Sequence, residues 1–191
     1  ESLENHRVKE IMSCPVNTIH EVESLHKLVD VLSSTNHGGF PITDEDHRFL
    51  GLITRFELLV IFIRAINNKE FLNLTEDGLM EPSVEYSDIN RMRGHYMSDP
   101  ALHQGLLEQI KTAGDKNLRI NLARYVNRSA ISVTETFSLQ RTYTMFRVMG
   151  LRHLTVVDNG NRVTGIVTRK DLQNSNLMSR LAATKSNNNP I

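Results

Sequence analysis

Four consecutive side chains near the end of this 191-residue sequence are its clearest candidates for chemistry. Thr168, Arg169, Lys170 and Asp171 bring together a hydroxyl, two cations and a carboxylate. A hydroxyl beside cations suits phosphate, and a carboxylate can accept hydrogen bonds from both hydroxyls of a ribose. This group therefore predicts the binding of a nucleoside phosphate.

The same residues also have a purely structural interpretation. A threonine at the end of a strand, followed three positions later by an acid, is typical of a helix N-cap. Thr168 would then cap a helix that opens over residues 169–174, with Asp171 in its first turn. The two interpretations do not exclude each other.

The octapeptide that contains these residues occurs twice. GLITRFEL over residues 51–58 corresponds to GIVTRKDL over residues 165–172, which lies 114 positions later. The same offset, without gaps, joins roughly residues 8–58 to residues 122–172. A constant offset over such a length indicates a duplicated module.

The elements that must position these residues follow one order in both copies. Alternating and helical spacings of apolar residues predict them. In the first copy they are a strand over 17–20, a helix over 21–34, strands over 40–43 and 49–54, and a helix over 56–66. In the second they are a strand over 132–134, a helix over 138–149, strands over 154–158 and 163–168, and the start of a helix over 169–174. Each copy is thus β-α-β-β-α, and the predicted fold class is α/β (α+β). One copy has only about 50 residues and buries its sheet poorly alone, so two copies should pack together.

The remaining segments complete the predicted domain organisation. We expect repeats over residues 8–66 and 121–180, a partly disordered linker over 67–120 with a short helix near 102–112, and a disordered tail over 181–191. The apolar run from Leu58 to Ile66 is expected to pack on another protomer or on a membrane domain. The helical stripe of Tyr143, Phe146 and Met149 is expected to be core or dimer interface.

Composition and spacing argue against several classes of function. The 22 basic and 22 acidic residues cancel, so a nucleic-acid partner is not expected. Cys14 is the single cysteine and the histidines lack ligand spacing, so neither a disulfide framework nor a metal site is predicted. No nucleophile with a base and an orienting partner is recognisable, so no catalytic residue is predicted. The sequence shows no signal peptide, and its apolar runs fall far below the ~20 residues of a spanning helix, which predicts a soluble chain.

The repeat ending in G-h-h-T-x-x-D resembles the cystathionine β-synthase (CBS) domain, which occurs as tandem pairs. The stretches STNHGGFPITDEDHRFLGLITRFEL and FRVMGLRHLTVVDNGNRVTGIVTRKDL are similar to the cytoplasmic C-terminal region of eukaryotic CLC chloride channels and chloride/proton exchangers, nearest the intracellular (lysosomal or vacuolar) branch. The resemblance implies a pseudo-twofold pair of repeats, called a Bateman module, in which a cleft between the repeats can hold an adenine nucleotide.

The resemblance also implies roles for individual residues. His37, otherwise a surface loop histidine, matches the ring that stacks on adenine, and Gly38 matches the residue whose backbone reads the base. Asp171 matches the ribose-binding acid. In the first repeat Glu57 replaces this acid, so the second cleft is not expected to bind a nucleotide. The other implied nucleotide-binding residues are Val16, Asn17 and Thr18 beside the first strand, Pro41 in the G-F-P segment, and Thr168 and Arg169 facing phosphate.

Taken together, the resemblance implies a regulatory domain at the cytoplasmic face of an intracellular membrane. ATP, ADP or AMP would be a regulatory ligand, with no cofactor required. The implied partners are the transmembrane domain of the same CLC protein and a second copy in a homodimer. The alternative is a structural module for dimerisation and trafficking that has no functional ligand. An enzyme is a third and more distant option, because CBS pairs also occur on metabolic enzymes.

Overall fold

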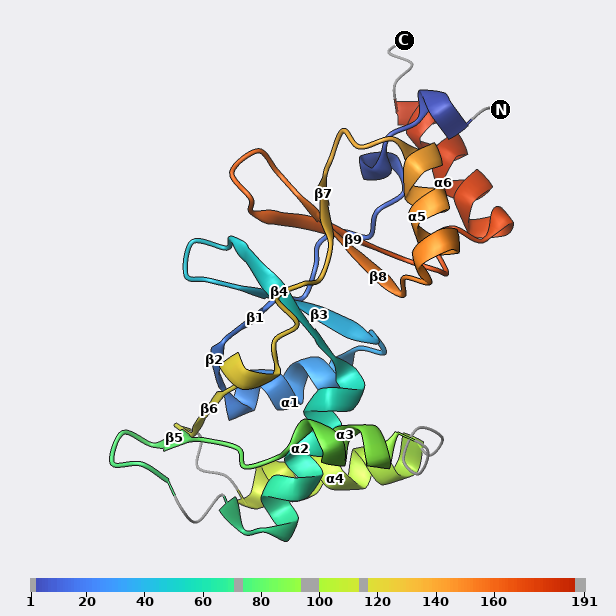
Figure 1. Cartoon of the computed structure of the whole chain (residues 1–191). Coiled ribbons are helices and arrows are strands. Elements are labelled where there is room, and N and C mark those ends of the chain that lie inside the picture. The colour runs from blue at the N-terminus through green and yellow to red at the C-terminus, as the bar shows by residue number, and fades with distance from the viewer. Residues whose placement is uncertain (1–2, 71–73, 94–99, 114–116, 188–191) are drawn as a thin grey trace. The chain divides into compact units, whose positions relative to one another are not determined.

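The structure is a computed structural model that describes residues 3–70, 74–93, 100–113 and 117–187 (Figure 1). The chain divides into two compact units. Unit 1 comprises the residues up to 16, residues 45–49 and the residues from 129 onward, and unit 2 comprises residues 17–44 and 50–128. Each unit therefore centres on one repeat but also contains the first residues of the other repeat.

Unit 2 is built on a three-stranded sheet in the order β1–β3–β4. Its strands are β1 (Ile19–His20), β3 (Gly39–Thr43) and β4 (Phe49–Thr54), and β1 runs parallel to β3. Helix α1 (Leu25–Ser34) lies between β1 and β3 along the chain, and α2 (Arg55–Asn67) follows β4. This order confirms the predicted β-α-β-β-α pattern of the first repeat.

A second, small sheet in unit 2 was not predicted. It has the order β2–β6–β5, from β2 (Val22–Ser24), β6 (Arg119–Asn121) and β5 (Leu79–Met80). We expected residues 21–34 to be one helix, but residues 22–24 pair with β6 instead. The helix begins only after Ser24, because the Ser24 hydroxyl accepts the Lys27 backbone N–H at 3.2 Å and so caps it.

The segment between the repeats forms part of the core of unit 2. It contains α3 (Tyr86–Met92) and α4 (Pro100–Ala113), and α4 packs on α1 and α2. The helix predicted near residues 102–112 is thus present, and its Leu106, Leu107 and Ile110 are buried. The linker also forms β5 and α3, which were not predicted individually, and the partial disorder predicted for it stays a prediction. Residues 71–73, 94–99 and 114–116, on which that prediction also falls, lie outside the described residues.

The apolar face of α2 is covered within the chain itself. Residues 58–63 are all buried among the side chains of unit 2, and α3 and α4 both pack on this helix. The expectation that residues 58–66 meet another protomer or a membrane domain is therefore wrong for this stretch of buried side chains.

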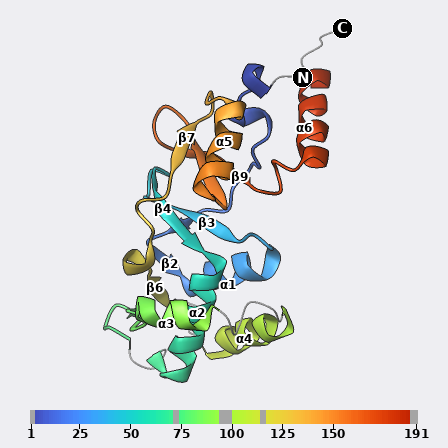
Figure 2. The same ribbon diagram turned by 45° about the vertical axis from the view of Figure 1, so that its right-hand side comes forward.

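Unit 1 contains the second repeat. Its sheet has the order β7–β8–β9, with β7 (Ser132–Thr134) parallel to β8 (His153–Val157) and β8 antiparallel to β9 (Val163–Thr168). Helix α5 (Leu139–Met149) joins β7 to β8, and α6 (Asn174–Asn187) follows β9. The N-terminal short helices η1 (Leu3–Asn5) and η2 (Val8–Glu10) pack against α5 and α6, as both views show (Figure 1, Figure 2).

The structure corrects one expectation for unit 1 and bears on a second, for which the dimer-interface alternative stays a prediction. The tail predicted to be disordered over 181–191 continues α6 as far as Asn187, because Leu177 and Leu181 are buried in the core of unit 1. Residues 188–191 lie outside the described residues. In the stripe of α5, Phe146 is buried, whereas Tyr143 and Met149 are exposed, so the stripe contributes a single residue to the core.

Candidate functional site

The turn that follows β9 holds the first predicted site residues. Asp171 Oδ2 accepts hydrogen bonds from the Thr168 backbone N–H at 2.7 Å and from the Thr168 hydroxyl at 2.9 Å. The Asp171 N–H in turn donates to the Thr168 carbonyl at 3.1 Å. The structure thus brings Thr168 and Asp171 together in a closed turn.

The expected helix over residues 169–174 is wrong, because residues 169–173 form a turn and a bend, and α6 begins only at Asn174. The N-cap interpretation is correct for the first repeat instead. There Thr54 and Glu57 form a capping box at the start of α2, and the Thr54 hydroxyl accepts the Glu57 N–H at 3.2 Å. The two copies differ because apolar residues continue from Leu58 in the first, while Gln173, Asn174 and Ser175 follow in the second and favour turns.

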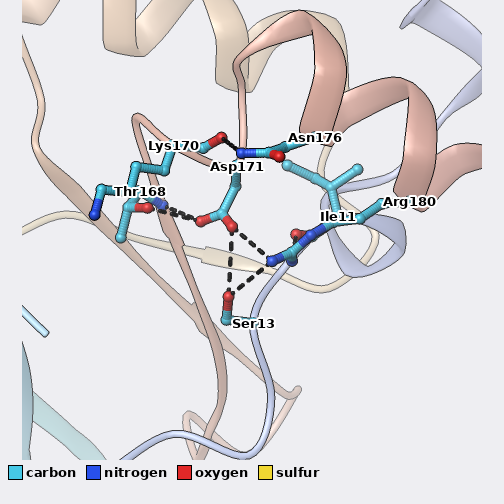
Figure 3. A network of polar contacts seen from close by, with 7 residues as sticks. All are labelled: Ile11, Ser13, Thr168, Lys170, Asp171, Asn176 and Arg180. Atoms are coloured by element: carbon cyan, nitrogen blue, oxygen red, sulfur yellow. Dashed lines mark hydrogen bonds and ion pairs between the residues drawn. The ribbon is translucent and has the colours of Figure 1, made fainter. Parts of the chain in front are cut away.

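Asp171 lies inside a network of polar contacts (Figure 3). Its residue exposure is 5%, and its Oδ1 lies 2.8 Å from Arg180 Nη2 and 3.4 Å from the Ser13 hydroxyl, which donates to it. Arg180 also donates to Ser13 Oγ at 3.2 Å and to the carbonyl of Ile11. The buried charge of Asp171 is therefore paired and hydrogen-bonded, as a buried carboxylate requires.

Sequence reasoning missed Arg180 and Ser13. Ser13 is 158 positions from Asp171 in sequence, so no local pattern connects the two. A signal did exist for Arg180, since it lies between Leu177 and Leu181 on the face of α6 that enters the core. A single cation among core-facing positions of a helix indicates a buried acidic partner.

The arginine of each octapeptide binds backbone carbonyls. Arg55 Nε donates to the His37 carbonyl at 2.7 Å, and Arg169 Nε donates to the Leu151 carbonyl at 2.8 Å, at positions related by the same offset of 114. Arg55 also reaches the carbonyls of Leu32 and Thr35 near the end of α1. We expected Arg169 to face phosphate, but its guanidinium is directed to the carbonyls of Gly150 and Leu151. This shared structural role explains why the Thr-Arg pair occurs twice.

The glycine of each octapeptide allows a close approach of the first residues of the other repeat. A Cβ on Gly51 would lie 2.5 Å from the Asn127 carbonyl oxygen, and a Cβ on Gly165 would overlap the Met12 side chain. Beside them, Leu52 pairs with Asn127 in unit 2, and Ser13 pairs with Ile166 in unit 1, through backbone hydrogen bonds of 2.8–3.1 Å. The octapeptide therefore serves the docking of these two segments.

The remaining predicted residues lie before β1 and β3. His37 and Gly38 are exposed at the entrance to β3, and the Gly38 carbonyl accepts the Arg55 N–H at 2.9 Å. The His37 ring has only an edge contact with Phe40, with ring centroids 6.4 Å apart. Pro41 is buried in β3, and Val16, Asn17 and Thr18 are half-buried in the segment before β1. Val16, Thr168, Arg169 and Asp171 belong to unit 1 and the other five to unit 2.

Glu57 occupies the position in the first repeat that Asp171 occupies in the second. Burial raises the pKa of the Glu57 carboxyl, while hydrogen bonds from Thr54 and the charge of Arg93 act against this rise. The Glu57 carboxylate is thus held by its capping role, and its charged form is less favourable than that of an exposed glutamate.

Metal sites and membrane-spanning helices can be assessed for the part of the chain that the structure describes. There, no three or more His, Cys, Asp or Glu side chains are grouped so that they could hold a metal ion. No helix among the same residues is long and apolar enough to cross a membrane.

Comparison with known protein families supports the duplicated fold and the repeated octapeptide. The family described as the CBS domain matches residues 8–64 and 122–175. This chain belongs to the CBS domain family and carries a tandem CBS pair.

Curated CLC transport proteins contain regions similar to this chain. H(+)/Cl(-) exchange transporter 7 of Bos taurus is 36% identical over 171 residues, covering 86% of this chain and 20% of the relative. Chloride channel protein C of Dictyostelium discoideum is 31% identical over 176 residues, covering 90% of this chain and 22% of the relative. The chain therefore spans about one fifth of the length of these CLC relatives.

Solved structures confirm the fold class. The crystal structure of CBSX2 in complex with AMP is similar with a TM-score of 0.55 and 17% identity, covering 92% of this chain and 99% of that chain. At this identity the likeness concerns the fold, and it agrees with a mixed α+β CBS pair.

Proposed function

We propose that this chain is the regulatory domain of a CLC-type chloride channel or exchanger and that it binds an adenine nucleotide through residues of both repeats. The observation that carries the proposal is the tandem CBS pair in a chain that matches CLC relatives over 86–90% of its length. Support for an adenine nucleotide as the ligand comes from CBSX2, a CBS pair of similar fold solved in complex with AMP.

The proposed ligand contacts follow from the chemistry of each residue. His37 has an exposed ring whose contact with Phe40 is edge-on, and such a ring suits the face of an adenine. Gly38 and residues 16–18 offer backbone groups, and Pro41 holds the strand beside them. Asp171 is the acceptor for the ribose hydroxyls. Thr168 is the residue proposed to face the phosphates, while Arg169 holds the carbonyls of residues 150 and 151.

The proposed effect of the nucleotide is to bias transport in the remainder of the protein. A ligand changes such an equilibrium only when its affinity differs between two conformations of the domain. The transmembrane part of the same protein is the proposed partner, at the cytoplasmic face of an intracellular membrane such as that of a lysosome or vacuole. The domain needs no cofactor and performs no catalysis in this proposal.

Calorimetric titration of this chain with ATP, ADP and AMP tests the proposal. We expect binding to at least one of them and a rise in melting temperature, because a ligand that binds only the folded state stabilises it by about 2.7 kcal/mol at one hundred times its dissociation constant. His37→Ala should weaken binding, and His26→Ala, on the exposed side of α1, is the matched control. No heat and no shift with millimolar concentrations of all three nucleotides would contradict the proposal.

Substitutions of two acidic residues test the proposal that Asp171 binds the ribose. Asp171→Asn keeps the shape of the side chain and removes the charged acceptor, so affinity should fall by roughly ten- to a hundredfold. Glu57→Ala should leave affinity nearly unchanged, since Glu57 is assigned to the cleft without a nucleotide. An equal loss in both variants would show that the assignment of the cleft is wrong.

A structural module for dimerisation and trafficking is the second candidate function. It is favoured by the internal partners of Asp171 and by exposed apolar side chains on α5 and α6, where Val148, Met149 and Met178 are 77%, 54% and 57% exposed. This candidate predicts a homodimer in sedimentation together with no response to any nucleotide. A monomer at high micromolar concentration would contradict it.

A further inference from the structure

We infer that Arg180 is a latch on Asp171, so that an adenosine ligand reaches this acid only by displacing Arg180. The inference rests on the proposed nucleotide-binding function and describes how that site is regulated. In the latched arrangement the carboxylate is bound to residues of its own unit, and in the released arrangement one of its oxygens is open to a ribose.

The Asp171 carboxylate already has a full set of donors. A carboxylate offers about four acceptor positions. Four donors use them: the Thr168 N–H and hydroxyl on Oδ2, and Arg180 and the Ser13 hydroxyl on Oδ1 (Figure 3). Two ribose hydroxyls therefore cannot bind Asp171 without replacing two of these donors.

The geometry of the four contacts decides which donors leave. Both Thr168 donors belong to the turn of residues 168–171 and are bonded at 2.7 and 2.9 Å. On Oδ1, the Ser13 bond is long at 3.4 Å, and the Arg180 side chain is 35% exposed while that of Asp171 is 7% exposed. Arg180 can turn toward solvent without unfolding the turn, so Oδ1 is the oxygen that a ribose would take.

Arg180 also connects neighbouring elements of unit 1. It links α6 to the N-terminal segment, because it contacts the Ile11 carbonyl and the Ser13 hydroxyl as well as Asp171. Leu177 and Leu181 remain buried and keep α6 in place when the ion pair opens. Release of Arg180 would thus loosen α6 from residues 11–13 without detaching it, and ligand occupancy becomes coupled to this contact.

The latch is confined to the second repeat. At the offset of 114 positions, Ile66 stands where Arg180 would have its counterpart, and Asn127 stands where Ser13 does. The first repeat therefore offers no arginine at this position, and its Glu57 is engaged with Thr54 in the capping box of α2. The difference between the two octapeptides thus extends to the residues that surround their acids.

The test compares Arg180→Ala with Arg147→Ala, which removes the same charge from an exposed position on α5 in the same unit. Adenosine and ATP are the probes, in calorimetric titrations of the whole 191-residue chain. We expect Arg180→Ala to bind adenosine about tenfold more tightly than the wild type, because the ligand no longer competes with a charge-assisted hydrogen bond. A cation that merely attracts phosphate predicts the opposite, which is weaker ATP binding and unchanged adenosine binding.

The outcomes separate the latch from the function on which it rests. Equal or weaker adenosine binding by Arg180→Ala, when the wild type binds, overturns the latch and leaves the proposed function standing. Absence of adenosine and nucleotide binding in both chains overturns the proposed function and the latch with it. If Arg180→Ala does not fold, amide hydrogen exchange of the wild type decides. Saturating ATP should increase exchange in α6 relative to α5, and unchanged or slower relative exchange in α6 overturns the latch.

Discussion

At the scale of single residues, the repeated octapeptide is first of all a structural device. Its glycine leaves room for the first residues of the other repeat, and its arginine binds carbonyls at the loop before β3 or β8. Its acid differs between the copies, with Glu57 capping α2 and Asp171 joined to Arg180. The shared glycine and arginine therefore support the fold, and the acid, one of the four positions that differ, is the one assigned to the ligand.

The binding of backbone carbonyls by Arg55 and Arg169 predicts how much each arginine contributes to the stability of the fold. Arg55→Ala should lower the free energy of unfolding by about 1–3 kcal/mol, because it strands several partly buried carbonyls. Arg169→Ala should cost less, since its contacts are exposed. Chemical denaturation measures both, and the neighbouring exposed Lys170→Ala is the control. Equal and negligible effects of all three would contradict the carbonyl role.

Glu57 predicts a dependence of stability on pH. Its pKa is higher in the folded chain than the usual 4.5, so its contribution to stability is largest below the unfolded pKa and is lost as pH rises through the folded pKa. Glu57→Gln keeps a residue that suits a capping box and removes the charge. It should therefore raise the melting temperature by a few degrees near pH 7 and have little effect near pH 4.

Glu23 provides a control of opposite sign for the same experiment. Burial opposes ionisation of Glu23, but hydrogen bonds from the His20 and Ser24 backbone and the contact with Lys27 lower its pKa overall. Its contribution to stability is present above the unfolded pKa and is lost as pH falls through the folded pKa. Glu23→Gln should accordingly destabilise the chain near pH 7, and a stabilising effect there would show that these signs are wrong.

At the scale of elements, the two repeats use their helices differently. Helix α2 starts at once after β4 and is covered by α3 and α4, while α6 starts five residues after the end of β9. Helix α4 comes from the segment between the repeats, and it places Leu106, Leu107 and Ile110 in the core of unit 2. This segment is therefore a structural part of the unit as well as a connection.

Substitution in α4 measures that contribution. Ile110 is fully buried, so Ile110→Ala should lower the free energy of unfolding by about 2–4 kcal/mol, as for a core residue of a repeat. Lys111→Ala, on the exposed side of the same helix, should change it by less than about 0.5 kcal/mol. Thermal or chemical denaturation gives both values. A negligible cost at Ile110 would mean that the linker only connects the repeats.

At the scale of the whole molecule, periodicity and the repeat offset were enough to predict the fold class and most elements of both repeats. They could not predict β2, β5 and β6, because these short strands depend on pairing across long sequence separations. They also could not predict that Arg180 and Ser13 surround Asp171, because only the folded chain brings these residues together. For the candidate site, the octapeptide indicated Asp171, which the fold buries, but it did not indicate the side chains that bind the Asp171 carboxylate.

Unit 1 is built from segments that lie far apart in the sequence, and this has a consequence for synthesis on the ribosome. Unit 2 is complete in sequence once residue 128 has been made, whereas unit 1 needs both the residues up to 16 and those from 129 onward. Val8 and Ile11, which end in the core of unit 1, are made before β9 and α6 and must wait for these elements before they are covered. During that interval they are apolar side chains without their final neighbours, so we expect this segment to be accessible to chaperones, and termination before α6 would leave the core incomplete.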